Sequence, residues 1–256
     1  MFRVVDDRPD SHAVVSLASP GPLRVFAHVR ATADAADLTG LRVLLVADLL
    51  ARAAELGGLQ VLTTWAFTGE PAGMATVEGA AAALGVHPPV LPAADLAGAW
   101  PGGPAGVHVT DGSTTADNGS GIVIRAAAAR LAQDASPGSA AGMLGSPDAL
   151  ALRLALMSLP RRQPAELTVG RLIDASQTLS RWRGRVARWA ESPSGAIPEP
   201  TAVTVRAAFG DLDTAAVLTL LNGLAADETV PPGPRFETFV YADRVLGLDL
   251  PRDIGR

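Results

Sequence analysis

The loop RATADAADLTG (residues 30–40) joins an apolar strand candidate to a helix candidate, which is a common place for an anion to bind. The first backbone N–H groups of a helix have no partner inside the helix, and that end carries about half a positive charge. The polar residues at this point are Asp37 and Thr39, followed by Gly40. Because a carboxylate can itself cap the helix, the sequence favours Asp37 or Thr39 as a cap over a bound phosphate.

Two neighbouring features could also contact a ligand. Arg42 lies near the start of the same helix and is either a surface arginine or a group that faces a ligand cleft. The polar loop DGSTTADNGSG (residues 111–121) carries Ser113 and Asn118 but no cation. Its backbone amides could hold an anion, as glycine-rich loops do elsewhere.

A basic segment lies further along the chain. Eight arginines fall between Arg153 and Ala190, opposed only by Glu166 and Asp174. The four that give the helix at 168–191 its basic character are Arg181, Arg183, Arg185 and Arg188. They form either a solvated helix face beside two core tryptophans, or a patch for nucleic-acid phosphates. The overall acidic charge favours the solvated face.

Composition excludes several classes of protein. The 256 residues carry a net charge of −5, which argues against a general binder of nucleic acid or membrane surfaces. Cysteine is absent, so disulfides, thiol nucleophiles and thiolate zinc sites are excluded, and all 21 basic residues are arginine. The four histidines have no metal-ligand spacing. No segment resembles a signal peptide or a membrane span, which predicts a soluble cytoplasmic protein.

The elements that would position these residues begin with a βαβ unit from Leu23 to Trp65. It reads as strand 23–29, helix 41–58 and strand 59–65, and ends its helix at a glycine pair. In that helix Asp48, Arg52 and Glu55 fall on one side, which we expect to face solvent, with Asp48 and Arg52 as an i,i+4 pair.

The rest of the chain extends this unit into two domains. We expect a helix at 74–84, short strands at 107–110 and 122–124, and a helix at 125–134. After residue 147 the pattern becomes helical, with helices at about 147–159, 168–191, 199–208, 211–226 and 235–247. The predicted fold is α/β: a Rossmann-like parallel-sheet nucleotide-binding domain (1–134), a linker (135–146) and an all-α helical domain (147–256).

Several stretches resemble the cysteinyl-tRNA synthetases and the related cysteine ligases of mycothiol biosynthesis. Residues 20–65 are similar to the family's opening, which has a strand ending in C-G-P-T-V-Y-D, then H-I-G-N/H-A-R, then a V-x-x-D-x-L-x-R helix. Further stretches are similar to later family segments, the most specific being the last: AAALGVHPP (81–89), SPDALALRLALMS (146–158), FGDLDTAAVLTLLNGLA (209–225) and RFETFVYADRVLGLDL (235–250). The resemblance implies a truncated class I aminoacyl-tRNA synthetase-like protein with a stem-contact-like helical domain.

The family's functional positions are changed in this chain. Its first zinc-binding cysteine falls on His28, its proline on Arg30 and its final aspartate on Asp34, so the resemblance implies substrate contacts there. The H-I-G-N/H signature, which holds ATP, falls on residues 37–40, where the chain reads Asp-Leu-Thr-Gly. The K-M-S-K-S signature cannot exist without lysine; the loop with Ser113 and Asn118 lies where it would sit. The long middle segment that carries zinc ligands is largely missing, so zinc is not expected.

Four functions remain open at this point, and one of them is a purely structural subunit whose cleft face is covered by a partner. The first is a catalytically degenerate synthetase-like protein that serves as a binding or regulatory module without cysteine activation. The second is an ATP- and magnesium-dependent enzyme of changed specificity that uses Arg30, Arg42 or Arg125 in place of the lost groups. The third is a tRNA-associated protein that uses the arginine-rich helix. Whether the chain is an enzyme stays uncertain, with the changed signatures favouring no activity.

Overall fold

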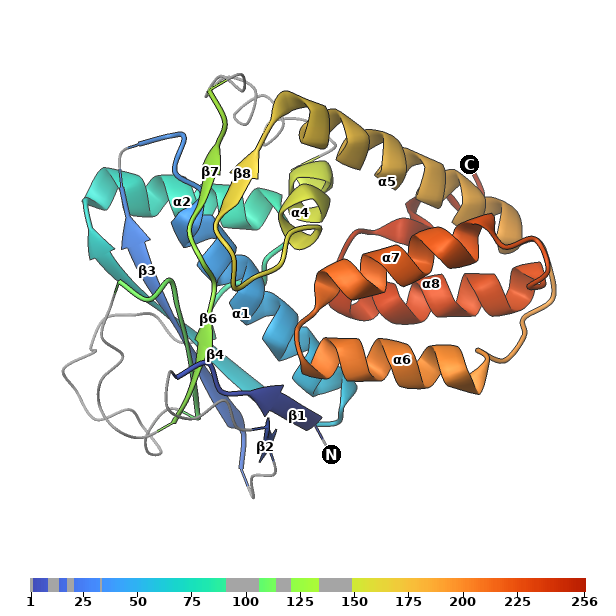
Figure 1. Ribbon diagram of the computed structural model, residues 1–256, viewed down its shortest axis with the longest axis horizontal. Coiled ribbons are helices and arrows are strands. Elements are labelled where there is room, and N and C mark those ends of the chain that lie inside the picture. The colour runs from blue at the N-terminus through green and yellow to red at the C-terminus, as the bar shows by residue number, and fades with distance from the viewer. Residues whose placement is uncertain are drawn as a thin grey trace.

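The chain forms two halves that lie side by side, a parallel sheet with its helices and a group of long helices (Figure 1). The structure is a computed structural model and describes residues 2–8, 14–17, 21–32, 34–90, 106–113, 121–133 and 149–256. The predicted linker (135–146) lies outside the described residues.

The described elements alternate between strands and helices in the first half and are mostly helical in the second. The strands are β1 (Phe2–Val5), β2 (Val14–Leu17), β3 (Leu23–Ala31), β4 (Val61–Gly69), β5 (Val107–Thr110), β6 (Ile122–Arg125), β7 (Ala129–Leu131) and β8 (Ala165–Leu167). The helices are α1 (Thr39–Leu56), α2 (Pro71–Ala83), α4 (Ala149–Met157), α5 (Val169–Trp189), α6 (Glu199–Gly210), α7 (Thr214–Ala226), α8 (Pro232–Leu246) and the 3₁₀ helix η1 (Leu250–Asp253).

The main sheet has four strands in the order β4-β3-β5-β6, and every neighbouring pair is parallel. The two central strands β3 and β5 carry buried apolar residues, as expected for parallel strands that pack against a helix. Val25, Ala27 and Val29 of β3 are almost fully buried and belong to the main core together with α1. The prediction of an α/β fold with a parallel sheet is confirmed, and this sheet is compatible with a Rossmann-like domain.

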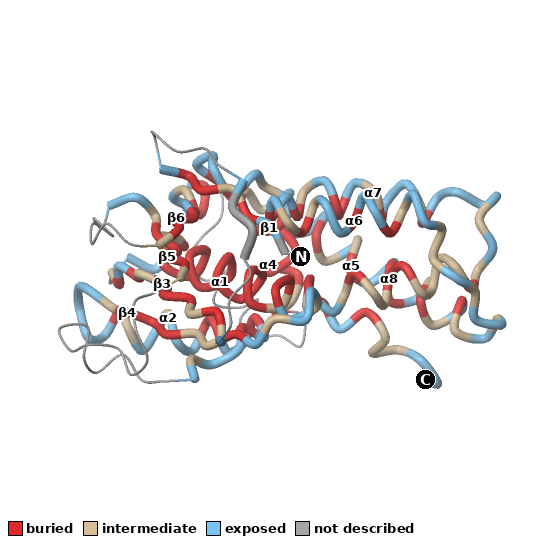
Figure 2. Tube along the Cα trace, turned by 90° about the horizontal axis from the view of Figure 1, so that it is seen from below, coloured by how far each residue is buried: buried red, intermediate tan, exposed pale blue. Residues whose placement is uncertain are grey.

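Helix α1 is the central element of the molecule. Fourteen of its 18 residues are buried, so it is enclosed on nearly every side, as its red colour in Figure 2 shows. It packs on β3, β4 and β5 and also contacts α2, α6 and α8. The two halves therefore share one core, with α1 between the sheet and the helices.

The expectation of a solvent-facing side on α1 is wrong for Asp48. The Asp48 side chain is buried and contacts Arg153 of α4, with 2.6 Å between Oδ2 and Nη2. The predicted pair with Arg52 is confirmed at 2.8 Å, and Glu55 is exposed. Asp48 is buried because α4 and the end of α8 cover this side of α1: Arg153 also donates to the backbone oxygens of Leu84 and Leu246.

The prediction of a helix at 125–134 is also wrong. Residues 129–131 form β7, which pairs in parallel with β8. The backbone of β7 also forms an isolated antiparallel β-bridge with the loop before α1, between Asp37 and Arg130. Three residues are too few to show a strand period in the sequence. The strand exists because Leu38 and Leu131 donate backbone hydrogen bonds across to Ala129 and Ala36, far away in the chain.

The helices from α4 to α8 follow their predicted pattern, but the prediction that residues 147–256 are all-α is wrong at residues 165–167, which form β8. The two tryptophans of α5 are buried: the Trp182 ring centroid lies 5.5 Å from that of Phe239, and the Trp189 centroid lies 5.2 Å from it. Both contacts are edge-on, a favoured geometry for aromatic pairs. Within the described residues, no helix is long and apolar enough to cross a membrane.

Candidate functional site

The strand order creates a switch point between β3 and β5. From β3 the chain first moves to β4 on one side and later returns to β5 on the other. Open parallel sheets bind ligands beside such a point, at the carboxyl ends of the strands. The loop from β3 to α1, which carries the predicted site residues, leaves from this edge.

A pocket of about 550 Å³, which we call the switch-point pocket, lies beside this loop. Three of the predicted residues line it: Asp34, Asp37 and Thr39. The other walls come from residues 128–130 at the start of β7 and residues 164–166 at the start of β8. The small sheet of β7 and β8 therefore closes over the start of α1 and builds the pocket together with the predicted loop.

The first amide of α1 is already bound by the protein itself. One Asp37 carboxylate oxygen accepts the backbone N–H of Thr39 at 2.9 Å. The prediction of Asp37 or Thr39 as the N-cap is nevertheless wrong, because Leu38 holds the N-cap position and no side-chain cap hydrogen bond is formed there. The Thr39 hydroxyl donates to the Ala129 backbone oxygen at 3.3 Å and lies 3.2 Å from the Ala129 nitrogen, which ties the helix start to β7. A first-turn amide that a phosphate would use is thus already bound.

The charges around the switch-point pocket are mainly negative. Its charged lining residues are Asp34, Asp37, Glu166 and Arg130, so three carboxylates face one guanidinium. Asp34, Arg130 and Glu166 are exposed side chains. This balance opposes a triphosphate and favours a ligand that carries a positive charge. Among the described residues, no group of three or more His, Asp or Glu side chains is placed to hold a metal ion.

Both interpretations of Arg42 are wrong. Its side chain is buried, and its guanidinium donates to five backbone oxygens and to no other group among the described residues. Those oxygens belong to Ala127, Ala128, Leu159, Pro160 and Gln163, at 2.7–3.3 Å. Burial lowers the pKa of Arg42 to about 10, so it stays charged at neutral pH. Arg42 holds the turns before β7 and β8 together and does not line the pocket.

Gly40 has a packing role at the position where ATP contact was predicted. A Cβ atom added there would lie 3.0 Å from Val29 Cγ1 and 3.2 Å from the Arg30 backbone oxygen. The start of α1 can approach β3 this closely because residue 40 has no side chain.

We expect Gly40→Ala to lower the free energy of unfolding by about 1–3 kcal/mol, because the helix must move away from β3 to admit the methyl group. Urea unfolding measures this. Gly79→Ala on α2 is the matched control, since nothing lies within 4 Å of its added Cβ atom and alanine favours helix. Equal stability of the two variants would contradict the packing role.

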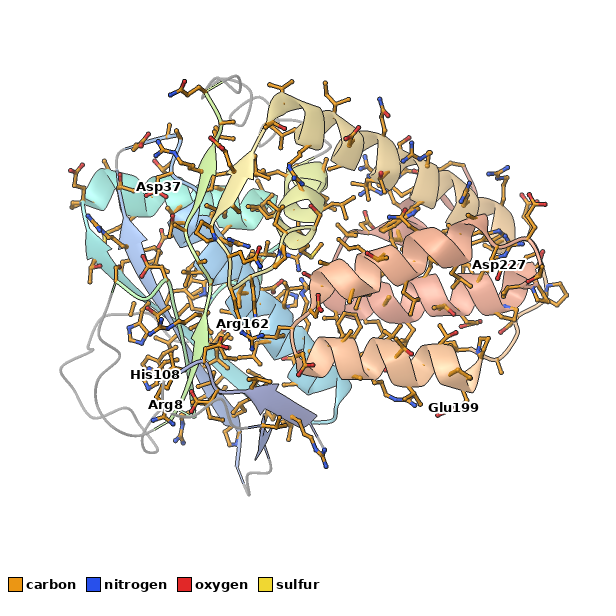
Figure 3. The ribbon with its side chains drawn as sticks, viewed as in Figure 1. Arg8, Asp37, His108, Arg162, Glu199 and Asp227 are labelled. Carbon is orange, nitrogen blue, oxygen red and sulfur yellow. The ribbon has the colours of Figure 1, made fainter. Side chains whose placement is uncertain are left out.

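His28 and His108 form a contact on the face of the sheet opposite α1. His28 Nε2 and His108 Nδ1 are 2.9 Å apart, and the Phe26 ring lies beside both imidazoles. Burial, together with the neighbouring His108, lowers the pKa of His28 to about 4. Figure 3 places His108 well away from Asp37, so the pair is separate from the switch-point pocket.

A lowered histidine pKa has a defined effect on stability. The unfolded chain binds a proton at His28 near pH 6.5, and the folded chain does so only near pH 4. We therefore expect stability to be independent of this group above pH 6.5 and to fall as the pH drops from 6.5 to 4. Urea unfolding at a series of pH values measures this fall, and His28→Phe should reduce it. If NMR showed that the His28 imidazole of the folded chain titrates near pH 6.5, the lowered pKa would be contradicted.

The remaining predicted ligand residues lie apart from the pocket. Arg30 is exposed on the same sheet face as His28, and neither lines the switch-point pocket. The Ser113 hydroxyl donates to the Asp111 carboxylate at 2.7 Å. Asn118 lies outside the described residues.

The four arginines of α5 do not form one surface. Arg183 is buried and donates to the backbone oxygens of Leu248 and Asp249, so its assignment to a basic patch is wrong. Arg185 is half-buried and donates to the Ala225 backbone oxygen at 2.7 Å. Arg181 and Arg188 remain exposed. The guanidiniums of Arg183 and Arg185 therefore donate to carbonyl groups just after α8 and in the last turn of α7.

Sequence reasoning missed Arg130 and Glu166. They face each other across the β7–β8 pair. In both strands an exposed charged residue stands between two buried apolar ones, Ala129 and Leu131 or Ala165 and Leu167. That alternation is the only signal, and it is too short to be distinguished from a loop or helix.

Comparison with known proteins adds no relative. A scan against protein-family models finds no match, and a search of the curated proteins finds none either.

Proposed function

We propose that the chain is a catalytically degenerate relative of the cysteinyl-tRNA synthetases that binds a small molecule without activating it. The observation that carries this proposal is the state of the α1 start. Asp37 binds a first-turn amide, and both Nη groups of Arg42, the cation nearest to it in the chain, donate to backbone oxygens. A parallel sheet with its helix is retained, while the groups that would hold ATP phosphates are engaged in structure.

The ligand of this module occupies the switch-point pocket. Its three carboxylates favour an amine or another cation, and Arg130 offers a partner for a carboxylate or hydroxyl group. The volume of about 550 Å³ is within the ordinary range for small-molecule sites. These properties support an amine-bearing ligand and disfavour a nucleotide.

The catalytic part of the proposal is tested by ATP–pyrophosphate exchange with each proteinogenic amino acid. We expect exchange no faster than in a mixture without protein, because the described pocket has no cationic cluster for the leaving pyrophosphate. Titration calorimetry with ATP and Mg²⁺ should show no binding. Exchange above background with any amino acid would refute the proposal and favour an ATP-dependent enzyme of changed specificity.

The binding part is tested with amines as probes. Putrescine, agmatine and amino-acid amides are titrated into the protein, and Glu166→Gln is compared with Glu191→Gln, an exposed carboxylate at the far end of α5. We expect at least one probe to bind, with an affinity that Glu166→Gln weakens and Glu191→Gln leaves unchanged. Equal affinity in the two variants would place the ligand elsewhere.

A further inference from the structure

A second pocket lies where the sheet half meets the helical half. It has a volume of about 300 Å³, and we call it the turn pocket. One wall is the turn 159–163 after α4, and the other is the turn 211–215 between α6 and α7. Figure 3 shows Arg162 of the first wall between the sheet and the helices. The turn pocket shares no lining residue with the switch-point pocket. Its volume lies at the small end of ligand sites.

Arg161 gives this pocket an unsatisfied donor. Its side chain is 8% exposed. Its Nη1 group donates to the Asp7 carboxylate and to the Arg125 backbone oxygen, the latter at 3.0 Å. Its Nε group has no acceptor in the described part of the chain. A buried charged donor without a partner costs free energy, so an oxygen atom of a ligand is favoured beside it.

Arg162 adds further donors on the same wall. Its Nε group donates to the Asp7 carboxylate at 2.6 Å, and its side chain is half-exposed. Its two Nη groups have no acceptor among the described residues. Because Arg161 and Arg162 share the single carboxylate of Asp7, this wall keeps one positive charge in excess.

The opposite wall is negative. Asp213 caps α7, since one of its carboxylate oxygens accepts the Ala216 backbone N–H at 3.0 Å. Asp211 is exposed and accepts no hydrogen bond from the described residues. A simple anion would meet Asp211 and Asp213, and a simple cation would meet Arg161 and Arg162. A zwitterion satisfies both walls.

We propose that the turn pocket binds a small zwitterion of the α-amino acid class. Its carboxylate lies against Arg161 and Arg162, and its ammonium group lies against Asp211. The inference does not rest on the proposed function, because its residues are separate from the switch-point pocket.

The test is titration calorimetry of the full chain with each proteinogenic amino acid. We expect at least one to bind with a dissociation constant below about 1 mM. The amine that lacks the carboxylate of that amino acid, and the acid that lacks its amino group, should each bind at least about tenfold more weakly. No saturable binding by any amino acid overturns the proposal, as does equal binding of the amine or of the acid.

Variants then assign the binding to the turn pocket. Asp211→Asn and Arg162→Gln change exposed or half-exposed groups, so the fold is retained, and each should weaken amino-acid binding by at least about tenfold. Glu191→Gln, at an exposed carboxylate just after α5, is the matched control and should have no effect. Binding that Glu166→Gln weakens and that Asp211→Asn and Arg162→Gln leave unchanged would assign the amino acid to the switch-point pocket and refute this site.

Discussion

Replacing Arg42 by alanine is expected to lower the free energy of unfolding by about 3–5 kcal/mol. The guanidinium is buried and joins five backbone oxygens from two chain segments that follow it by 85 to 121 positions. Without it these oxygens lose a charged donor that water reaches poorly, and a cavity opens beside α1. Urea unfolding followed by circular dichroism gives the difference between the variant and the parent chain.

Two further variants separate the charge of Arg42 from its shape. Arg42→Lys keeps the positive charge but has three donors on one atom and no planar fork, so it should recover only part of the loss. Arg30→Ala changes an exposed arginine of β3 and should alter stability by no more than about 0.5 kcal/mol. If Arg42→Ala lowered the free energy of unfolding no more than Arg30→Ala does, the contacts of Arg42 with the carbonyl groups would not stabilise the fold.

The role of Arg42 could not be predicted from the sequence. Its position near the helix start suggested a ligand contact or the surface, because only local spacing was visible. Its acceptors are backbone oxygens, which carry no sequence signature. They lie beside α1 in the folded chain, where β7 is paired with β8. The same holds for Arg183, whose acceptors lie 65 and 66 positions away.

Elements that depend on local pattern were predicted well. Strands β3, β5 and β6 are mostly apolar and rich in β-branched residues, and helices α5 to α8 show helical spacing between prolines. The pair β7 and β8 lacks such a pattern, since each has three residues and their hydrogen-bond partners lie far away in the chain. The loop 30–40 was therefore predicted to contact a ligand, whereas Arg130 and Glu166, which line the same pocket, were missed.

Asp48 of α1 and Arg153 of α4 form a buried ion pair between the sheet half and the helical half. Asp48→Asn is expected to destabilise the fold by about 3–5 kcal/mol, because Arg153 is then left charged and almost completely enclosed. Glu55→Gln, an exposed change on the same helix, is the control and should fall within about 0.5 kcal/mol of the parent chain. The double variant Asp48→Leu/Arg153→Met should lose less stability than Asp48→Asn, since no unpaired charge remains.

The contribution of the Asp48–Arg153 ion pair to stability should depend on pH. Burial raises the pKa of Asp48, but the charges of Arg153 and Arg52 and the hydrogen bond from the His87 amide outweigh it, so the pKa lies below its ordinary value of 3.8. A carboxyl group with a lowered folded pKa contributes stability above its unfolded pKa and loses it as the pH falls through the folded value. Stability should therefore fall with acid below about pH 5 in the parent chain, and that fall should be smaller in the double variant because it has no carboxyl group at this position. Parallel curves of unfolding free energy against pH for the two chains would show that Asp48 is not stabilised as a carboxylate by Arg153.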